Sequence, residues 1–321
     1  MRQRAKKLRR PGRLALIGSL VIALVGAWSG ATFAAFTSQA NNPGNTITAA
    51  PDWEAPTIAA KTITKAAGGV GGYIAQNSNF YVYANVTDGG NPASGVASVD
   101  LTATLPTYGA VTLPLVAGTY NVGGVAFNYR SAVQTMPPMA AQTIAYNIVA
   151  DDNAGNSRTS AGSVVVDNTG GTATTVQTAN GGATAGRPEA GDTITYTFSE
   201  PVEPMSIMAA WTNPLASQNA TVSINNNAVG GNDSVTVGGA NLGTVNLGGA
   251  RYVTATRTYT NSVMTVSGNT LTIVLGTASG AGTTSGNTNM SWASSNLVDD
   301  RAGNAFSGNT AAETGGGDRE F

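Results

Sequence analysis

Apolar and polar residues alternate in short runs along most of the chain after residue 55, and clusters of glycine, asparagine and proline separate these runs. In NFYVYANVTD (79–88), Phe80, Val82 and Val86 fall on one face of an extended strand, because strand side chains alternate with a period of two. The same alternation recurs in QTIAYNIVADD (142–152) and EAGDTITYTFSEPV (189–202). The pattern therefore predicts an all-β protein built from many short strands.

The runs fall into two groups, which we expect to form two tandem β-sandwich domains. The first group predicts a domain over residues 55–168. The hexad DDNAGN at 151–156 returns as DDRAGN at 299–304, and such a repeat marks a recurring structural unit. We therefore place a second domain over 170–306. A polar segment (36–54) precedes both domains, and residues 307–321 are predicted to be a flexible tail.

The repeated hexads predict two equivalent hairpin turns. The second aspartate of each hexad can accept backbone N–H bonds, and the glycine can adopt the positive φ that closes the turn. The predicted turn residues are Asp152, Gly155, Asn156, Asp300, Gly303 and Asn304. We favour this structural role for Asp152 over a metal site formed with Asp151.

The first 35 residues have the charge pattern of an export leader. Seven of the 16 basic residues lie within positions 1–13, and a mainly apolar run follows from Leu14 to Phe36. Pro-Gly after Arg9 and Arg10 does not fit a twin-arginine signal, so we expect export through the Sec pathway. As a helix the run would be about 34 Å long, so a retained N-terminal membrane anchor stays open beside the favoured cleaved signal peptide.

The junction GATFAAFTSQANNPGNTITA (30–49) resembles the leader junction of the TasA/camelysin family of bacterial surface and biofilm-fibre proteins. Ala50 stands where that family usually has glycine, and the rest of the chain does not resemble the family's body. The resemblance implies that a signal peptidase cuts between Ala35 and Phe36. The matching residues are Ala34, Ala35, Phe36, Asn45, Thr46, Ile47, Thr48 and Ala49.

Two further stretches resemble bacterial extracellular Ig-like domains. YNIVADDNAGNSRTSAGSVVVDNT (146–169) is similar to the closing hairpin of one group of such repeats, and GDTITYTFSEPV (191–202) to a strand of another. The resemblance implies that both predicted domains are Ig-like β-sandwiches.

Composition excludes several classes of function. The chain has no cysteine and no histidine, so disulfides, thiolate metal sites and a Ser-His-Asp triad are impossible. From Phe36 onward, nine basic and 17 acidic residues give a formal net charge of −8. An acidic chain lacks the basic footprint that nucleic-acid binding needs.

Three sets of residues are candidates for chemistry. Glu200 and Glu203 resemble a carboxylate pair for glycoside hydrolysis, although a strand end explains the same stretch. Trp53, Trp211 and Trp292 could form a sugar-binding platform, although burial is the ordinary use of tryptophan. Oxygen-rich junctions suit calcium, the one candidate cofactor. Its predicted ligands are Asp52, Glu54, Asp151, Asp152 and Asp167.

These observations predict a non-enzymatic, secreted or cell-surface protein of structural or adhesive function, typical of a bacterial biofilm matrix. Its N-terminal strand, NTITAA (45–50), is a candidate for joining copies into fibres by adding to an open sheet edge. The expected partners are a signal peptidase, other copies of the chain and cell-surface polymers. The alternatives are a carbohydrate- or protein-binding Ig-like module and, least favoured, part of a secreted glycoside-active enzyme.

Overall fold

The computed structural model describes residues 52–227 and 230–321. The chain from Asp52 to Phe321 forms one compact unit. The predicted leader, the cleavage residues Ala34, Ala35 and Phe36, and the predicted strand 45–50 lie outside the described residues. No helix within the described residues is long and apolar enough to span a membrane.

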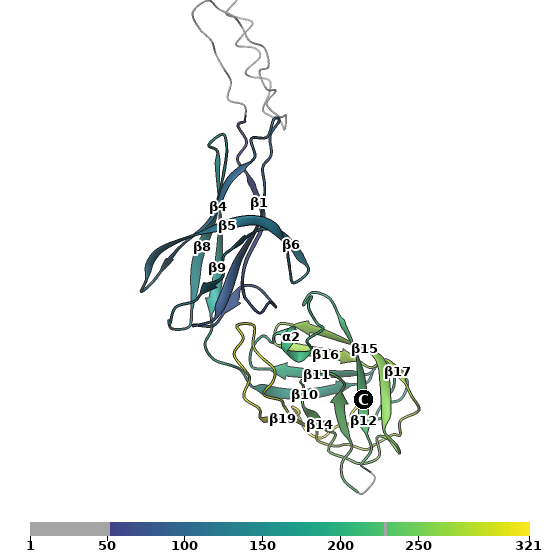
Figure 1. Cartoon of the computed structure of the whole chain (residues 1–321). Coiled ribbons are helices and arrows are strands. Elements are labelled where there is room, and N and C mark those ends of the chain that lie inside the picture. The colour runs from purple at the N-terminus through teal and green to yellow at the C-terminus, as the bar shows by residue number, and fades with distance from the viewer. Residues whose placement is uncertain (1–51, 228–229) are drawn as a thin grey trace, which may run out of the picture. The chain divides into compact units, whose positions relative to one another are not determined.

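The protein is all-β, and its strands gather into two groups, each with its own sheet and core (Figure 1). In the described chain the first β-domain holds a nine-stranded sheet in the order β1-β3-β6-β5-β4-β8-β9-β2, with β7 beside β3. Its strands are β1 (Thr57–Lys65), β2 (Tyr73–Ile74), β3 (Asn79–Thr87), β4 (Val96–Leu105), β5 (Gly109–Val122), β6 (Val125–Ser131), β7 (Gln134–Thr135), β8 (Gln142–Asp152) and β9 (Ser157–Val166).

The second β-domain holds a ten-stranded sheet in the order β10-β11-β16-β15-β12-β13-β14-β18-β19, with β17 beside β15. One short helix, α2 (Pro204–Ile207), follows β11. The strands are β10 (Ala173–Ala179), β11 (Thr193–Phe198), β12 (Gln218–Asn225), β13 (Ser234–Val237), β14 (Thr244–Asn246), β15 (Arg257–Ser267), β16 (Thr270–Val274), β17 (Thr277–Ala278), β18 (Ser291–Ala293) and β19 (Thr310–Ala312).

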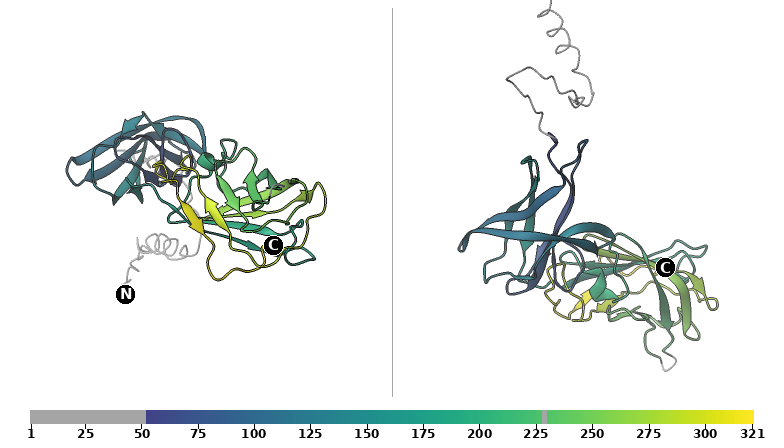
Figure 2. Two further views of the ribbon diagram at one scale, coloured as in Figure 1. Left: turned by 90° about the horizontal axis from the view of Figure 1, so that it is seen from below. Right: turned by 45° about the horizontal axis from the view of Figure 1, so that its top comes forward.

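Each sheet curls into a nearly closed, barrel-like domain, where the sequence predicted two separate sheets per domain (Figure 2). In the first β-domain the long strand β5 explains the difference. Residues 109–114 of β5 pair with β4, and residues 115–122 pair with β6, with an irregularity in that second pairing between Ala117 and Tyr120. The two halves of the domain therefore become one sheet. Near the remaining gap, Lys61 Nζ on β1 donates to Ser160 Oγ on β9 at 2.8 Å.

The two cores are built from different side chains. Aliphatic residues such as Val82, Leu101 and Ile148 dominate the first core. In the second core, Trp292 lies edge-on to Tyr196 and Phe198, with ring centroids 4.9 and 5.2 Å away. The aromatic residues bury more area per side chain, so the second core holds more apolar surface.

The predicted flexible tail, residues 307–321, is packed onto the second β-domain. Thr310–Ala312 forms β19, which pairs with β18, and Ala311 is buried in the core. Phe321 is 1% exposed and lies edge-on to Tyr252. The prediction was wrong because the apolar residues of this segment stand singly among glycines and give no periodic pattern. Only tertiary contacts hold these residues in place.

Candidate functional site

The repeated hexads form the same turn in both β-domains. Asp152 Oδ1 accepts the backbone N–H groups of Ala154 and Asn156 at 2.9 and 2.8 Å, while its Oδ2 accepts the Asn156 side-chain amide at 2.8 Å. Gly155 has a φ of +92°, a conformation that glycine adopts without steric cost. The aspartate therefore organises the turn through its carboxylate.

The second hexad is held in the same way, except that the glycine N–H donates in place of the alanine N–H. Asp300 Oδ1 accepts the N–H groups of Gly303 and Asn304 at 2.6 and 2.8 Å, and the Asn304 amide donates to Asp300 Oδ2 at 2.7 Å. Gly303 has a φ of +96°. Burial raises the pKa of Asp300, and the hydrogen bonds from Asn304 and Gly303 oppose that rise.

Each turn also holds the segment that enters its own domain. The Asn156 amide donates to the carbonyl oxygen of Asp52 at 3.4 Å, and the Asn304 amide donates to that of Asp167 at 3.1 Å. Asp52 and Asp167 are thereby brought beside Asp152 and Asp300. The repeat thus includes the entry segment as well as the closing hairpin.

Two equivalent acidic clusters result. In cluster 1 (Asp52, Asp88, Asp152) and in cluster 2 (Asp167, Glu200, Asp300), carboxylate oxygens lie within 4.8 Å of one another. Asp88 follows β3 and Glu200 follows β11, which are the second long strands of their domains. Each cluster therefore combines an entry residue, a strand-end residue and a turn residue.

In cluster 1, hydrogen bonds favour the ionised forms of Asp52 and Asp152. Backbone N–H groups of Glu54 and Ser94 donate to Asp52 at 3.0 and 2.8 Å and lower its pKa. Burial raises the pKa of Asp152, but the hydrogen bonds from Asn156 and Ala154 outweigh it and the net shift is downward. Gly95 N–H donates to Asp88 Oδ2, while the buried Asp88 Oδ1 has no hydrogen-bond partner among the described residues. An unpaired carboxylate oxygen between ionised neighbours suits a hard cation.

In cluster 2 the pKa of one carboxyl group is raised and not lowered. Burial, followed by the negative charges of Asp300 and Asp167, raises the pKa of Glu200 to about 7. Near neutral pH Glu200 is therefore partly protonated, and a cation bound there would have to displace that proton.

The structure does not bring the five predicted calcium ligands together in one place. Asp52 and Asp152 belong to cluster 1, but Asp167 belongs to cluster 2. Asp151 lies on β8 and accepts the Ser98 hydroxyl, while Glu54 is exposed and belongs to neither cluster. Asp88 was missed, although its place in a glycine-rich turn directly after a strand was visible in NVTDGG.

The predicted catalytic pair is used in two separate ways. Glu203 is 2% exposed, and its carboxylate accepts hydrogen bonds from Lys65 Nζ at 2.7 Å and the Val70 N–H at 2.9 Å. It also accepts the Met205 N–H at the start of α2. Glu200 instead belongs to cluster 2. The geometry gives Glu203 a structural role, because its oxygens are already engaged.

The aromatic residues form no exposed sugar-binding row in the described chain. Trp211 and Trp292 are buried in the second β-domain, whereas Trp53 is 75% exposed. In the first β-domain, the guanidinium of Arg130 covers the rings of Tyr81 and Tyr120 at 4.3 and 4.4 Å. Their faces are therefore occupied by this chain's own arginine.

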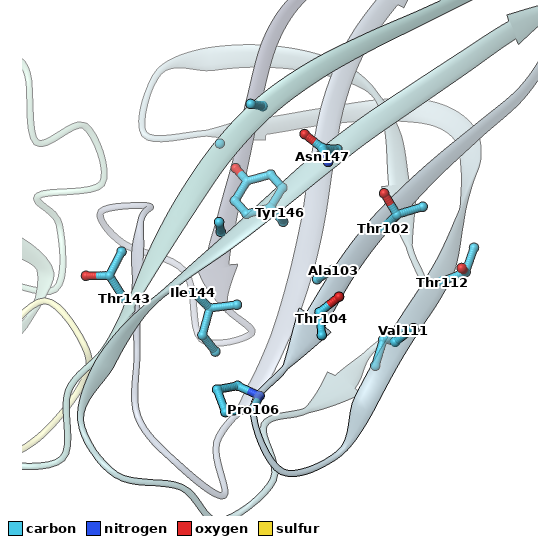
Figure 3. A pocket seen from close by; sticks show the side chains of 14 residues that line it. Thr102, Ala103, Thr104, Pro106, Val111, Thr112, Thr143, Ile144, Tyr146 and Asn147 are labelled. Atoms are coloured by element: carbon cyan, nitrogen blue, oxygen red, sulfur yellow. The ribbon is translucent and has the colours of Figure 1, made fainter.

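The first β-domain also has a hollow of about 470 Å³ at its β4, β5, β8 and β9 strands (Figure 3). Thr102 and Thr112 are paired across β4 and β5 in its wall, and Asn147 lies on β8. No acidic or basic side chain lines this hollow. It therefore lacks the carboxylate pair that glycoside hydrolysis needs.

No protein-family model matches this chain, and a comparison with curated proteins found no similar protein.

Proposed function

We propose that this protein is a non-enzymatic structural or adhesive component of the bacterial cell surface or extracellular matrix, built from two Ig-like β-domains. The observation that carries the proposal is the repeated construction of entry segment, strand-end acid and DDxAGN turn in the two β-domains. Tandem copies of one module are the usual way in which extended surface proteins are built. The basic, apolar leader supports export.

The state of the acidic side chains supports a structural role. Asp152, Asp300 and Glu203 are buried, and backbone or side-chain donors engage their oxygens. The buried Asp192 and Asp233 likewise accept backbone N–H groups, including those of Gly181 and Tyr252. Carboxylates used this way hold loops in place and are not free to serve as a general acid or base.

Fibre formation is the form of this function that the sequence favours. The N-terminal strand at 45–50 would add to an open sheet edge of the next copy, a contact that does not close on itself and so builds a filament. The test is electron microscopy of the exported protein beside a variant lacking residues 36–50. A variant with 36–50 replaced by Gly and Ser of the same length controls for spacing.

We expect fibres from the exported protein and none from either variant, with unchanged thermal unfolding of the two β-domains. Fibres from the deletion variant, or an exported protein that stays monomeric at high concentration, would contradict this role of the N-terminal strand.

Calcium binding at cluster 1 is the second candidate function, and the unpaired Asp88 Oδ1 favours it. A calcium ion there would be held by Asp52, Asp88 and Asp152 and would stiffen the entry to the first β-domain. Calorimetric titration with Ca²⁺ should show a site that Asp88→Asn abolishes. Asp100→Asn on β4, outside both clusters, should leave that site intact. Equal binding by the two variants would exclude cluster 1.

A further inference from the structure

Residues 313–321, which we call the strap, follow β19 and pack on the second β-domain. At the start of the strap, the Glu313 N–H donates to the carbonyl oxygen of Met290 at 3.2 Å, and the Met290 N–H donates to Glu313 Oε2 at 2.8 Å. Residues 315–317 are glycines, which have no side chain to pack against the domain. The middle of the strap is therefore held through backbone contacts.

The other end of the strap is buried. Glu320 is 0% exposed, and its Oε2 accepts the hydroxyl of Thr178 on β10 at 2.6 Å. The N–H of Phe321 donates to the same hydroxyl at 3.2 Å, and the Phe321 ring lies edge-on to Tyr252. A carboxyl group thus lies inside the domain at the point where the strap is anchored.

Two carboxyl oxygens of the strap lack a hydrogen-bond donor. Carboxylate oxygens of Glu313, Asp318 and Glu320 lie within 4.8 Å of one another. The buried Oε1 of Glu313 has no partner among the described residues. Glu320 Oε1 has only the Thr288 hydroxyl, 3.5 Å away, but that hydroxyl lies 2.7 Å from the carbonyl oxygen of Leu247. A hydroxyl has one proton to donate, so the shorter contact takes it and Glu320 Oε1 is left without a donor.

No positive charge balances these acids. No arginine or lysine of the described chain, including the neighbouring arginine of the strap, forms an ion pair with them. Glu320 faces Glu313 and Asp318 on the strap and the Tyr252 hydroxyl on the body of the domain. Burial raises the pKa of Glu320 to about 8. Glu313 and Asp318 add to this rise in pKa, and the hydrogen bond from Thr178 opposes it.

We propose that one proton shared between Glu313 and Glu320 keeps the strap closed, and that the strap opens when this proton is lost to water. In the closed form, Glu320 Oε1 carries the proton and donates a hydrogen bond to Glu313 Oε1. One proton then satisfies both oxygens and removes one of two adjacent negative charges. This switch does not depend on the proposed structural or adhesive function.

The direction of the pH response follows from the two states of Glu320. Loss of the proton leaves two carboxylates together in a buried site, where each destabilises the other. In the open strap Glu320 is in water and has its ordinary pKa of 4.5. The proton therefore stabilises the closed form fully below about pH 4.5, and this contribution is lost as pH rises to about 8. Glycines 315–317 can act as the hinge.

Carboxyl ¹³C NMR of the purified full chain tests the shared proton. The chain has six glutamates, so labelling glutamate alone gives few signals. Glu313→Gln and Glu320→Gln assign the two signals of the pair. We expect both signals to move together at about pH 8, because the proton belongs to the pair. In Glu320→Gln the alkaline step of the Glu313 signal should disappear.

Hydrogen exchange tests the opening of the strap. The Thr288 N–H donates to the carbonyl oxygen of Asp318. The Gly186 N–H donates to that of Phe321. Both N–H groups are released when the strap opens, so after correction for intrinsic exchange they should lose protection roughly tenfold or more between about pH 6 and 8.5. The N–H groups of β11 should stay protected at the same pH, because the domain remains folded.

Conservative variants separate the pair from its surroundings. Glu320→Gln keeps the shape and a hydrogen-bond donor but cannot ionise, so it should abolish the alkaline loss of protection. Glu313→Gln removes the facing charge and should move the response to lower pH. Asp318→Asn, at an exposed acid of the same strap, is the matched control and should keep most of the response. Thermal unfolding confirms that each variant is folded.

Three results would overturn the proposal. The first is a pair of signals that titrate separately at about pH 4–5, as ordinary glutamates do. The second is an alkaline loss of protection that persists in folded Glu320→Gln. The third is release of the Thr288 and Gly186 N–H groups only together with those of β11, which would show unfolding of the whole domain.

Discussion

The two β-domains share one scheme at their turns and entry segments but differ in how their cores are filled. The second β-domain packs Trp292, Tyr196, Phe198 and Phe306 edge to face and buries them almost completely. The first relies on aliphatic residues and leaves a partly open apolar pocket of about 290 Å³ beside Leu101, Ala103 and Ile144. The hydrogen-bonded turns therefore hold the loops at one end of each domain in the same conformation. The sizes of the inward-facing side chains determine independently how closely the core is packed.

The domains also differ in how they hold buried acid. Hydrogen bonds lower the pKa of Asp52 in the first β-domain, whereas burial raises the pKa of Glu200 and Glu320 in the second. Glu320 is fully buried near Glu313 and Asp318, and its pKa rises to about 8. The two domains should consequently respond to pH in opposite directions.

The largest expected effect comes from emptying the filled core. Trp292→Ala should lower the free energy of unfolding of the second β-domain by roughly 3–5 kcal/mol, because it removes a large buried ring and its edge-to-face contacts. Trp53→Ala, at a site 75% exposed, should change it by less than about 0.5 kcal/mol. Urea unfolding measures both, and a loss below about 1 kcal/mol for Trp292→Ala would contradict the packing described here.

A pH titration should separate the domains. Glu320 and Glu200 are more basic in the folded state than the ordinary value of 4.5, so their stabilising contribution is full below about pH 4.5 and is lost as pH rises to about 7 and 8. Asp52 and Asp152 are more acidic when folded than the ordinary 3.8, so their contribution is lost only as pH falls below that value.

Hydrogen exchange followed by mass spectrometry reads the two domains separately. Between pH 5 and 8, after correction for intrinsic exchange, the second β-domain should lose protection, and Glu320→Gln should remove part of that loss. The first should lose protection only in strong acid. The same pH response in both domains would show that the opposite pKa shifts do not control their stability.

The turns test what the domains share. Gly155→Val should destabilise the first β-domain by roughly 1–2 kcal/mol, because a β-branched residue is strained at positive φ. Nothing lies within 4 Å of the added Cβ atom, so strain is the only source. Gly303→Val should act similarly on the second domain. Gly286→Val, equally unobstructed but without a positive φ, is the control and should be nearly neutral.

The smallest effect tests the pocket itself. Ala103→Val places two methyl groups beside empty space and should raise the free energy of unfolding by about 0.5–1 kcal/mol. Ala150→Val, at a fully buried position of β8 in the same domain, should lower it by about 1–3 kcal/mol through overpacking. If both substitutions destabilise the domain to the same degree, the space beside Ala103 is not available to a side chain.

Local patterns in the sequence revealed the strands, because alternation reports directly which face is buried. In β8 the buried residues Ile144, Tyr146, Ile148 and Ala150 follow the alternation of QTIAYNIVADD. The curling of each group into one sheet was not visible. In the first β-domain it depends on β5 changing partner from β4 to β6 between Pro114 and Leu115, which no periodic pattern records.

The acidic clusters could be predicted only in part. The hexads revealed Asp152 and Asp300, because the repeat is contiguous in the sequence. Asp88 and Glu200 join them from strands about 64 and 100 residues away, through long-range contacts of the kind a single sequence does not reveal. Comparing the ends of the second long strands, NVTD and TFSE, would have paired these two acids.

The most direct test of an exported structural protein is the N-terminus and the location of the chain in the cell that produces it. Fractionation followed by mass spectrometry should find the protein in the medium or at the surface, accessible to added protease, beginning at Ala35, Phe36 or Thr37. A full-length chain that is accessible at the surface would show that the leader is retained as an anchor, and it would still agree with the proposed surface function. A protease-protected chain in the cytoplasm with its leader intact would contradict the proposed function.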